Sequence, residues 1–346
     1  MVGQWPIVGR RRELAVFERA VSFGEHAGLV IHGRAGVGKT RLAEECRRQA
    51  AAAGHPTGRV TGSLSTVLVP LGAVAGLLAG GPGRAGPDGQ LDTAALFDQT
   101  RRALRQRHSG RRVVVVADDV PLLDAASLAL LGYLAAQGAI FLIATVRTGE
   151  QVPDLITGLW REGRLERVDL EDLGRADLET LLYQVLGGPV EASAAREFWE
   201  VTRGNPLYVR ELVLGCLASR ALVERSGVWH LEDPVPATAR LADLVGQRIG
   251  DLSAGARSVV ELLAVCEPLE LGYLETAAPA GVLQSLERAG LVTIAVAEGE
   301  VRLAHPLHGM VVRAAMPRSP LPATSARPIC SVTNGQLPSS RFASAR

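Results

Sequence analysis

A glycine-rich run near the start of the chain ends in a lysine and a threonine, at residues 33–40 (GRAGVGKT). Its glycines let backbone amides approach phosphate oxygens that side chains would otherwise block. Lys39 is expected to bridge the β- and γ-phosphates, and the hydroxyl of Thr40 is expected to bind Mg²⁺. The run therefore predicts a phosphate-binding loop, or P-loop, for ATP or ADP. A chance glycine-rich turn is the alternative, and the strand and helix predicted on either side of the run argue against it.

Lys39 is the only lysine of the chain, and the other 36 of its 37 lysine and arginine residues are arginines. An arginine replaces a surface lysine at little cost, but its planar guanidinium does not fit between phosphates as a compact ammonium does. The retained lysine thus stands where the substitution would fail.

A second candidate for chemistry follows a β-branched run, where Asp118 and Asp119 come directly after Val113–Ala117. An acid at the tip of a strand near a P-loop holds Mg²⁺ or its water shell, and we expect Asp118 to do so. Asp119 is the candidate base that orients an attacking water. The alternative is a pair of aspartates that cap a helix.

Two further positions allow a functional and a structural interpretation. Arg147 follows the apolar run 139–146, where a cation would lie beside the γ-phosphate. The alternative is an arginine that simply extends into solvent after a strand, and the sequence pattern is the same in both cases. The run 202–207 (TRGNPL) separates two predicted helices. It is a helix stop followed by a proline-started helix by local rules, and these favour a structural role over a cover for the nucleotide base.

Short apolar runs alternate with helical patterns in the first half, which predicts an α/β core with a parallel sheet. The predicted strands are 29–32, 59–62, 113–117, 139–146 and 167–170, and the predicted helices are 39–53, 91–108 and 125–137. The glycine- and proline-rich residues 80–89 indicate a surface loop.

From Leu173 onward the pattern is mostly helical, with predicted helices at 176–186, 191–202, 206–220, 241–265 and 281–289. The segments 291–297 and 300–304 indicate a hairpin around Glu298-Gly299, and helices followed by a hairpin suggest a winged helix. Residues 317–346 are rich in Pro, Ser and Ala and are expected to be disordered. The predicted division is a core at 1–170, a helical lid at 171–232, a winged-helix-like domain at 233–316 and a tail at 317–346.

Composition excludes several classes of protein. The net charge of +1 gives no general attraction to nucleic acid or to acidic membranes. The four cysteines form no C-x-x-C pair, which argues against a zinc site or a disulfide framework and favours reduced thiols in a cytoplasmic protein. No secretory signal is recognisable, and the apolar runs are too short to cross a bilayer.

Taken together, the motifs resemble the ATP-binding module of the large LuxR-type transcriptional regulators, which are signal-transduction ATPases related to AAA proteins. The resemblance covers about 5–317 and includes the P-loop and Arg147. Its other matching segments are 7–14 (IVGRRREL), 118–119 with 124–128 (DAASL), 204–209 (GNPLYV) and 305–307 (HPL).

The resemblance implies an AAA-like P-loop core of five parallel strands, a helical lid and a winged helix. It implies a switch with slow hydrolysis, in which ADP holds a closed form and ATP favours an open, self-associating form. Val8, Gly9 and Arg10 would lie near the adenine, and Pro206 would pack beside the base. His305 would sense the inner phosphates, although a histidine before a proline is often only structural. The full predicted nucleotide-binding set is Val8, Gly9, Arg10, Gly33, Arg34, Ala35, Gly36, Val37, Gly38, Lys39, Thr40, Arg41, Pro206 and His305.

Two departures from the family pattern bear on function. Pro121 stands where the family usually has a histidine, which puts hydrolysis in doubt but leaves phosphate and metal binding intact. The family's helical repeats and C-terminal helix-turn-helix are not recognisable, so we expect a truncated or frameshifted reading frame and no direct DNA binding by this chain. The competing hypotheses are a stand-alone P-loop ATPase or phosphotransferase, and a protein that binds DNA through its own winged helix.

Overall fold

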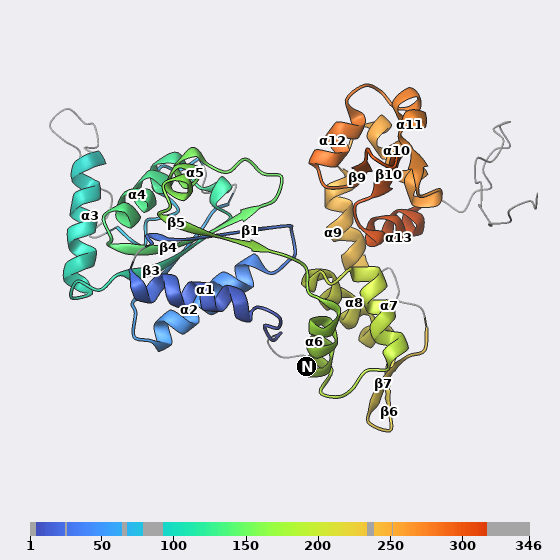
Figure 1. Cartoon of the computed structure of the whole chain (residues 1–346), viewed down its shortest axis with the longest axis horizontal. Coiled ribbons are helices and arrows are strands. Elements are labelled where there is room, and N and C mark those ends of the chain that lie inside the picture. The colour runs from blue at the N-terminus through green and yellow to red at the C-terminus, as the bar shows by residue number, and fades with distance from the viewer. Residues whose placement is uncertain are drawn as a thin grey trace, which may run out of the picture.

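The structure is a computed structural model that describes residues 5–24, 26–63, 68–78, 93–233, 239–250 and 252–316. The loop predicted at 80–89, the first two residues of the helix predicted at 91–108 and the tail predicted at 317–346 lie outside the described residues. Figure 1 shows a sheet covered by helices at one end of the molecule. A helical segment (175–231) and a C-terminal segment (239–316) lie at the other end.

The sheet of the core consists of five parallel strands in the order β2-β3-β4-β1-β5. The strands are β1 (Gly28–Gly33), β2 (Thr57–Thr61), β3 (Val113–Asp118), β4 (Ile140–Arg147) and β5 (Leu165–Leu170). The predicted parallel α/β core is therefore confirmed. Because β4 lies between β1 and β3, the ends of these three strands meet at one edge of the sheet.

Alternate residues of β3 face two different layers of the core. Val113, Val115 and Ala117 pack with the layer that includes α3 (Thr93–Arg107) and α4 (Ala125–Ala136). Val114 and Val116 pack with the layer that includes α1 (Arg11–Phe23) and α2 (Lys39–Ala52). Such burial on both faces explains why this strand is continuously apolar.

Two helices of the core were not expected from sequence, α1 and α5 (Asp154–Arg161). In α1 the apolar residues Leu14, Phe17 and Val21 follow helical spacing, but they stand among arginines that obscure the pattern. The predicted second strand at 59–62 is β2, which begins two residues earlier, at Thr57. Asp124 caps α4 by accepting a hydrogen bond from the backbone N–H of Ser127, at 2.8 Å.

The helical segment contains α6 (Arg175–Leu186), α7 (Ala192–Thr202) and α8 (Pro206–Ser219), close to the predicted bounds. It also contains an unexpected antiparallel hairpin of β6 (Leu222–Arg225) and β7 (Val228–Leu231). The hairpin turns at Ser226 and Gly227, which both have positive φ, as the two-residue turns that match strand twist require.

The C-terminal segment contains α9 (Ala239–Gly250), α10 (Ala254–Val265), α11 (Leu271–Ala277), α12 (Val282–Arg288) and α13 (Pro306–Ala315). Strands β8 (Leu269–Glu270), β9 (Val292–Ala295) and β10 (Glu300–Leu303) form a sheet in the order β8-β10-β9. The predicted hairpin of β9 and β10 is confirmed. The single helical stretch predicted at 241–265 is wrong, because Ser253 starts a new helix by accepting a hydrogen bond from Ala256 N–H.

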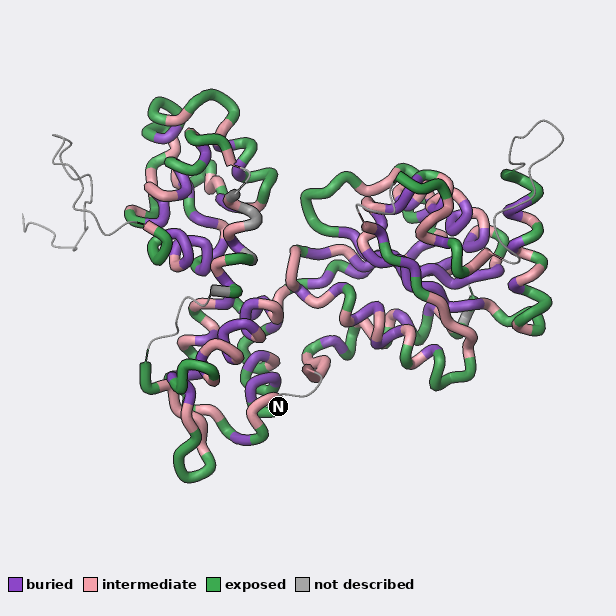
Figure 2. The backbone as a smooth tube through the Cα atoms, turned by 180° about the vertical axis from the view of Figure 1, so that it is seen from behind, coloured by how far each residue is buried: buried purple, intermediate pink, exposed green. Residues whose placement is uncertain are grey.

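Helix α13 joins the helical and C-terminal segments. Its Leu307 and Val311 belong to the buried cluster of α6–α9, whereas Val312 belongs to the cluster built on α10. The buried residues in Figure 2 continue accordingly from one segment into the other. Within the described ranges, none of the helices has the length and apolar character needed to cross a membrane.

Candidate nucleotide-binding site

The P-loop lies between the end of β1 at Gly33 and the start of α2 at Lys39, so its predicted strand-loop-helix setting is confirmed. Gly36 and Gly38 have φ of 81° and 103°, in the left-handed region where side chains are strained. A Cβ on Gly36 would also lie 2.7 Å from Oδ1 of Asn205. Gly36 is therefore required by its backbone conformation and by its neighbour.

The ammonium of Lys39 is held by the loop itself. Nζ donates hydrogen bonds of 2.9 Å to the carbonyl oxygens of Gly33 and Arg34, and the residue is only 6% exposed. Burial, followed by the charge of Arg147, lowers the pKa of Lys39. The lysine thus stands at the centre of the loop, where a phosphate oxygen could replace one of these carbonyls as its partner.

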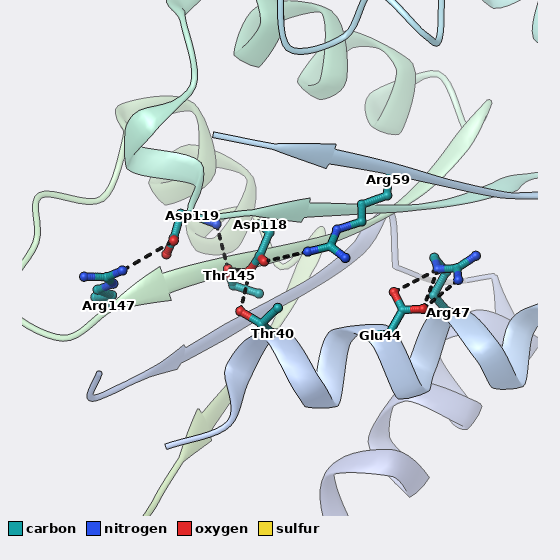
Figure 3. A network of polar contacts seen from close by, with 8 residues as sticks. All are labelled: Thr40, Glu44, Arg47, Arg59, Asp118, Asp119, Thr145 and Arg147. Carbon is teal, nitrogen blue, oxygen red and sulfur yellow. Dashed lines mark hydrogen bonds and ion pairs between the residues drawn. The ribbon is translucent and has the colours of Figure 1, made fainter. Parts of the chain in front are cut away.

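Asp118 lies at the tip of β3 and is surrounded by donors, as Figure 3 shows. Its Oδ1 accepts from the hydroxyls of Thr40, at 2.9 Å, and Thr145, at 2.8 Å. Its Oδ2 accepts from the guanidinium of Arg59 at 3.3 Å. Since Thr40 and Asp118 come from elements 78 residues apart, the fold brings the two predicted metal ligands into direct contact.

The donor set at this point fits Mg²⁺ carried by a nucleotide. Thr40 and Asp118 offer a hydroxyl and a carboxylate side by side, and Mg²⁺ is commonly held by one or two carboxylates together with substrate phosphates. The described residues contain no cluster of three or more His, Cys, Asp or Glu that would form a cage without phosphates.

Asp119 and Arg147 form an ion pair beside this centre, with 3.4 Å between Oδ2 and the guanidinium (Figure 3). Asp119 has a left-handed backbone, with φ of 51°, and its N–H donates to Thr145 Oγ1 at 2.9 Å. Thr145 therefore holds both acids, since its hydroxyl also donates to Asp118. Both predicted catalytic side chains, Asp119 and Arg147, line the cavity described next.

A cavity of about 810 Å³ opens along the P-loop, within the size range of ligand pockets. Its lining includes polar residues, among them Lys39 and Thr40, and apolar residues, among them Leu173 and Leu181. Most of its lining comes from the N-terminal stretch, the P-loop with the start of α2, and α8, and the rest comes from Asp119, Arg147, Leu173 and Leu181. The lining residues are Trp5, Pro6, Ile7, Val8, Arg10, Ala35, Gly36, Val37, Gly38, Lys39, Thr40, Arg41, Asp119, Arg147, Leu173, Leu181, Pro206, Leu207, Tyr208 and Arg210.

Twelve of the predicted site residues are therefore brought together, and five do not line this cavity: Gly9, Gly33, Arg34, Asp118 and His305. Asp118 lies directly behind Thr40, and Gly33 behind Lys39. Gly9 has φ of 71° and packs against Asp177. Arg10, which does line the cavity, is 8% exposed and supports the loop by donating to the Val37 carbonyl at 3.1 Å.

His305 lies in a different place. It is a cap of α13, where Nδ1 accepts from Leu307 N–H at 3.2 Å, and its Nε2 lies 2.9 Å from the carbonyl oxygen of Thr202. With Arg34 it lines a second, smaller cavity of about 350 Å³, which shares Ala35, Arg147 and Tyr208 with the first.

Eight of the lining residues were not assigned from sequence. Nor were Arg59, Thr145 and Asp172, which do not line the cavity but contact predicted site residues. Thr145 is the one polar residue within the apolar run of β4 before Arg147. A polar residue in such a run could have indicated from the sequence that Thr145 contacts the site. Arg59 and Asp172 carry no comparable signal, because an arginine within an edge strand and an aspartate just after a strand are both common on solvated surfaces. Their roles depend on contacts with distant parts of the chain.

Comparisons with known proteins agree with this geometry. Residues 6–143 match the family model of the AAA ATPase domain. The Orc1 protein of Aeropyrum pernix, solved in complex with DNA, is 15% identical, with 90% of this chain and 94% of that chain covered and a TM-score of 0.50. A mutant RuvB of Thermotoga maritima is 17% identical over 86% of this chain and 93% of its own, with a TM-score of 0.47. No curated protein matches. The chain therefore has an AAA-type P-loop ATPase fold, which implies nucleotide binding.

Proposed function

We propose that this protein is a nucleotide-dependent switch that binds ATP or ADP, hydrolyses ATP slowly with Mg²⁺, and responds to the nucleotide by rearranging its helical segment. One observation carries the proposal. The cavity along the P-loop is lined on one side by the core and on another by Pro206, Leu207 and Tyr208 of α8. A ligand that contacts both can favour one arrangement of them over another.

The phosphates are expected beside Lys39 and Thr40. The loop amides and the N-terminus of α2 supply donors there, and Lys39 supplies the charge. The adenine is expected beside the apolar lining residues Val8, Leu181 and Pro206. The cavity is therefore suited to a whole nucleotide rather than to a phosphate alone.

Thr40 and Asp118 would hold the metal, which neutralises phosphate charge when it is bound. Asp119 would orient the attacking water, and its ion pair with Arg147 keeps its carboxylate in place. Arg147 would contact the γ-phosphate from the end of β4. Pro121 follows Asp119 in the short 3-10 helix Val120–Leu122, which offers no further base at that point. This arrangement favours slow hydrolysis.

The proposed domains are the core at 1–170, a helical lid at 171–232, a winged-helix-like domain at 233–316 and a tail at 317–346. The lid assignment is supported by the contribution of α8 to the cavity. The winged-helix assignment is supported by the small antiparallel sheet β8-β10-β9, which packs with α10 and α12.

The wider role that we propose is that of a cytoplasmic LuxR-type transcriptional regulator that self-associates in its ATP state. It rests on the resemblance of the P-loop and the runs 7–14, 204–209 and 305–307 to that family. With a net charge of +1, the chain is not expected to bind DNA without a helix-turn-helix domain.

Identification of co-purified nucleotide tests the switch. The purified chain is denatured and the released nucleotide is identified, with Lys39→Ala treated in parallel. We expect ADP from the natural chain and none from the variant. A folded sample that neither releases nucleotide nor binds ATP on titration would contradict the proposal. Steady-state turnover above about 1 s⁻¹, in the range of ordinary enzymes, would instead favour a stand-alone ATPase.

A further inference from the structure

The joint between α7 and α8 contains Asn205, which is only 4% exposed. All the hydrogen-bonding positions of its side-chain amide are occupied by groups of the protein. Nδ2 donates to the carbonyl oxygen of Ala35 and to Oδ1 of Asp172, both at 3.1 Å. Oδ1 accepts from the backbone N–H groups of Leu207, at 3.2 Å, and Tyr208, at 3.5 Å. Two donors and two acceptor positions exhaust the amide, and they fix which atom is nitrogen.

Two successive carbonyls of the P-loop accept hydrogen bonds from this joint. Besides the bond from Asn205 to Ala35, the N–H of Leu207 donates to the Gly36 carbonyl at 3.2 Å. In a planar trans peptide the N–H points opposite to the C=O. The amides of Gly36 and Val37 therefore point away from the joint. Val37 N–H donates to the Arg34 carbonyl within the loop at 3.4 Å, so the joint helps to fix the turn that directs loop amides toward phosphate.

Asp172 links the joint to the core, because it follows β5 by two residues. Its carboxylate accepts from Asn205 and lies 3.8 Å from the guanidinium of Arg34, a P-loop residue. Burial raises the pKa of Asp172. Asp172 is only 18% exposed, and a carboxylate largely removed from water is costly unless it is hydrogen-bonded. Asp172 and Asn205 therefore hold each other in place.

Helix capping alone does not explain Asn205. The cap of α8 uses only Oδ1, and aspartate or serine caps a helix about as well as asparagine. The two N–H donors have no part in the cap, and they bind the P-loop and Asp172. The side-chain NH₂ group of Asn205 therefore has a role separate from helix capping.

We propose that Asn205 is a positioning residue that latches the lid to the P-loop, so that the shape of the loop and the docking of the lid depend on each other. The inference rests on the proposed function, because it assigns the coupling of the same nucleotide site. When the latch is intact, the amides of the loop are pre-set for phosphate. When the donors are lost, nucleotide binds more weakly, and it no longer affects the joint.

Three variants separate the latch from the cap. Asn205→Ser keeps a capping oxygen and removes both donors without adding charge. Asn205→Asp keeps the cap but places a carboxylate against Asp172, and combining it with Asp172→Asn relieves that repulsion without restoring the donor to Ala35. We expect all three to weaken binding of fluorescent ADP about 2- to 10-fold, the range for one lost hydrogen bond. The amide of Val37, which donates to the Arg34 carbonyl within the loop at 3.4 Å, should exchange hydrogen faster in each variant, even without nucleotide.

A merely structural role would lower the unfolding temperature and leave exchange in the P-loop unchanged. ADP affinity within twofold of the natural chain, together with unchanged loop exchange in Asn205→Ser, would overturn the latch. If the natural chain binds no nucleotide, the proposed function fails, and exchange in the absence of nucleotide still tests the latch. If the variants do not fold, the natural chain decides, because ADP must then alter exchange at Leu207 and Tyr208.

Discussion

The guanidinium of Arg59 lies 3.3 Å from Oδ2 of Asp118, on the side of the carboxylate opposite the hydroxyls of Thr40 and Thr145. Both oxygens of the predicted Mg²⁺ ligand are therefore engaged by groups of the protein itself. A divalent cation at Asp118 has to compete with the positive charge of Arg59. The Mg²⁺ concentration that nucleotide binding requires should therefore depend on this one surface arginine.

Substituting Arg59→Ala should lower the Mg²⁺ concentration needed for nucleotide binding. Arg59 is 47% exposed, so solvent weakens the ion pair, and a pair of this kind contributes about 0.2–1 kcal/mol. That range corresponds to a shift of roughly 1.5- to 5-fold in half-saturation by Mg²⁺. Binding of fluorescent ADP at increasing Mg²⁺ measures it. Arg48→Ala is the control, because Arg48 pairs with Glu45 on α2 instead. A higher Mg²⁺ requirement in Arg59→Ala would contradict this reading of the contact.

Substituting Gly36→Ala should destabilise the protein more than an alanine at another left-handed glycine. At φ of 81° an alanine is strained, and its Cβ would also lie 2.7 Å from Asn205 Oδ1. We expect a loss of about 2–4 kcal/mol in unfolding free energy from strain and overpacking together. Gly138→Ala, at φ of 64° with nothing near its Cβ, is the matched control and should lose about 1 kcal/mol. Urea unfolding measures both, and equal losses would show that the contact with Asn205 is unimportant.

Substituting Asp119→Asn should slow hydrolysis while leaving nucleotide affinity nearly unchanged. Asparagine keeps an oxygen for Arg147 but is a poor base, and loss of a positioned base costs about 100-fold or more. Single-turnover hydrolysis at saturating ATP and Mg²⁺ gives the rate, and ADP titration gives the affinity. An unchanged rate would remove Asp119 from the chemistry and leave it as a partner of Arg147 only.

The stability of the protein should depend on pH through Asp172. Burial is the main cause that raises the pKa of this carboxyl, with Glu171 adding to the rise and Arg34, Asn205 and Arg10 opposing it. The folded state therefore keeps its proton at a pH where the unfolded state, with an ordinary pKa of 3.8, has lost it. Stability from this group is present below pH 3.8 and is lost as pH rises through the raised pKa.

The measurement for Asp172 is urea unfolding over a range of pH. Asp172→Asn cannot titrate but can still accept the hydrogen bond from Asn205. Its unfolding free energy relative to the natural chain should rise with pH across this window and then level off. A difference that is constant with pH, or that falls, would show that the carboxyl is not disfavoured in the folded state.

The sequence by itself determined the parts of this protein that depend on neighbouring residues. The P-loop glycines, Lys39 and Thr40 could be identified because a phosphate-binding turn is built from consecutive residues. The buried strand before Asp118 was visible because a strand covered on both faces is continuously apolar. The capping pattern of Asn205 and Pro206 was likewise local, and from it alone the structural interpretation was the natural one.

Only the tertiary structure decided which distant groups meet. The strand order puts β4 between β1 and β3, and this brings Thr145 into contact with Asp118 and Asp119. The spacing of apolar residues along a single strand does not predict that strand order. Asn205 reaches the P-loop across 170 residues of sequence, and Arg59 reaches Asp118 from another strand. Such contacts arise from the packing of whole elements, whereas sequence patterns report backbone preference and burial along a single element. The chemistry could therefore be predicted, and the groups that position it could not.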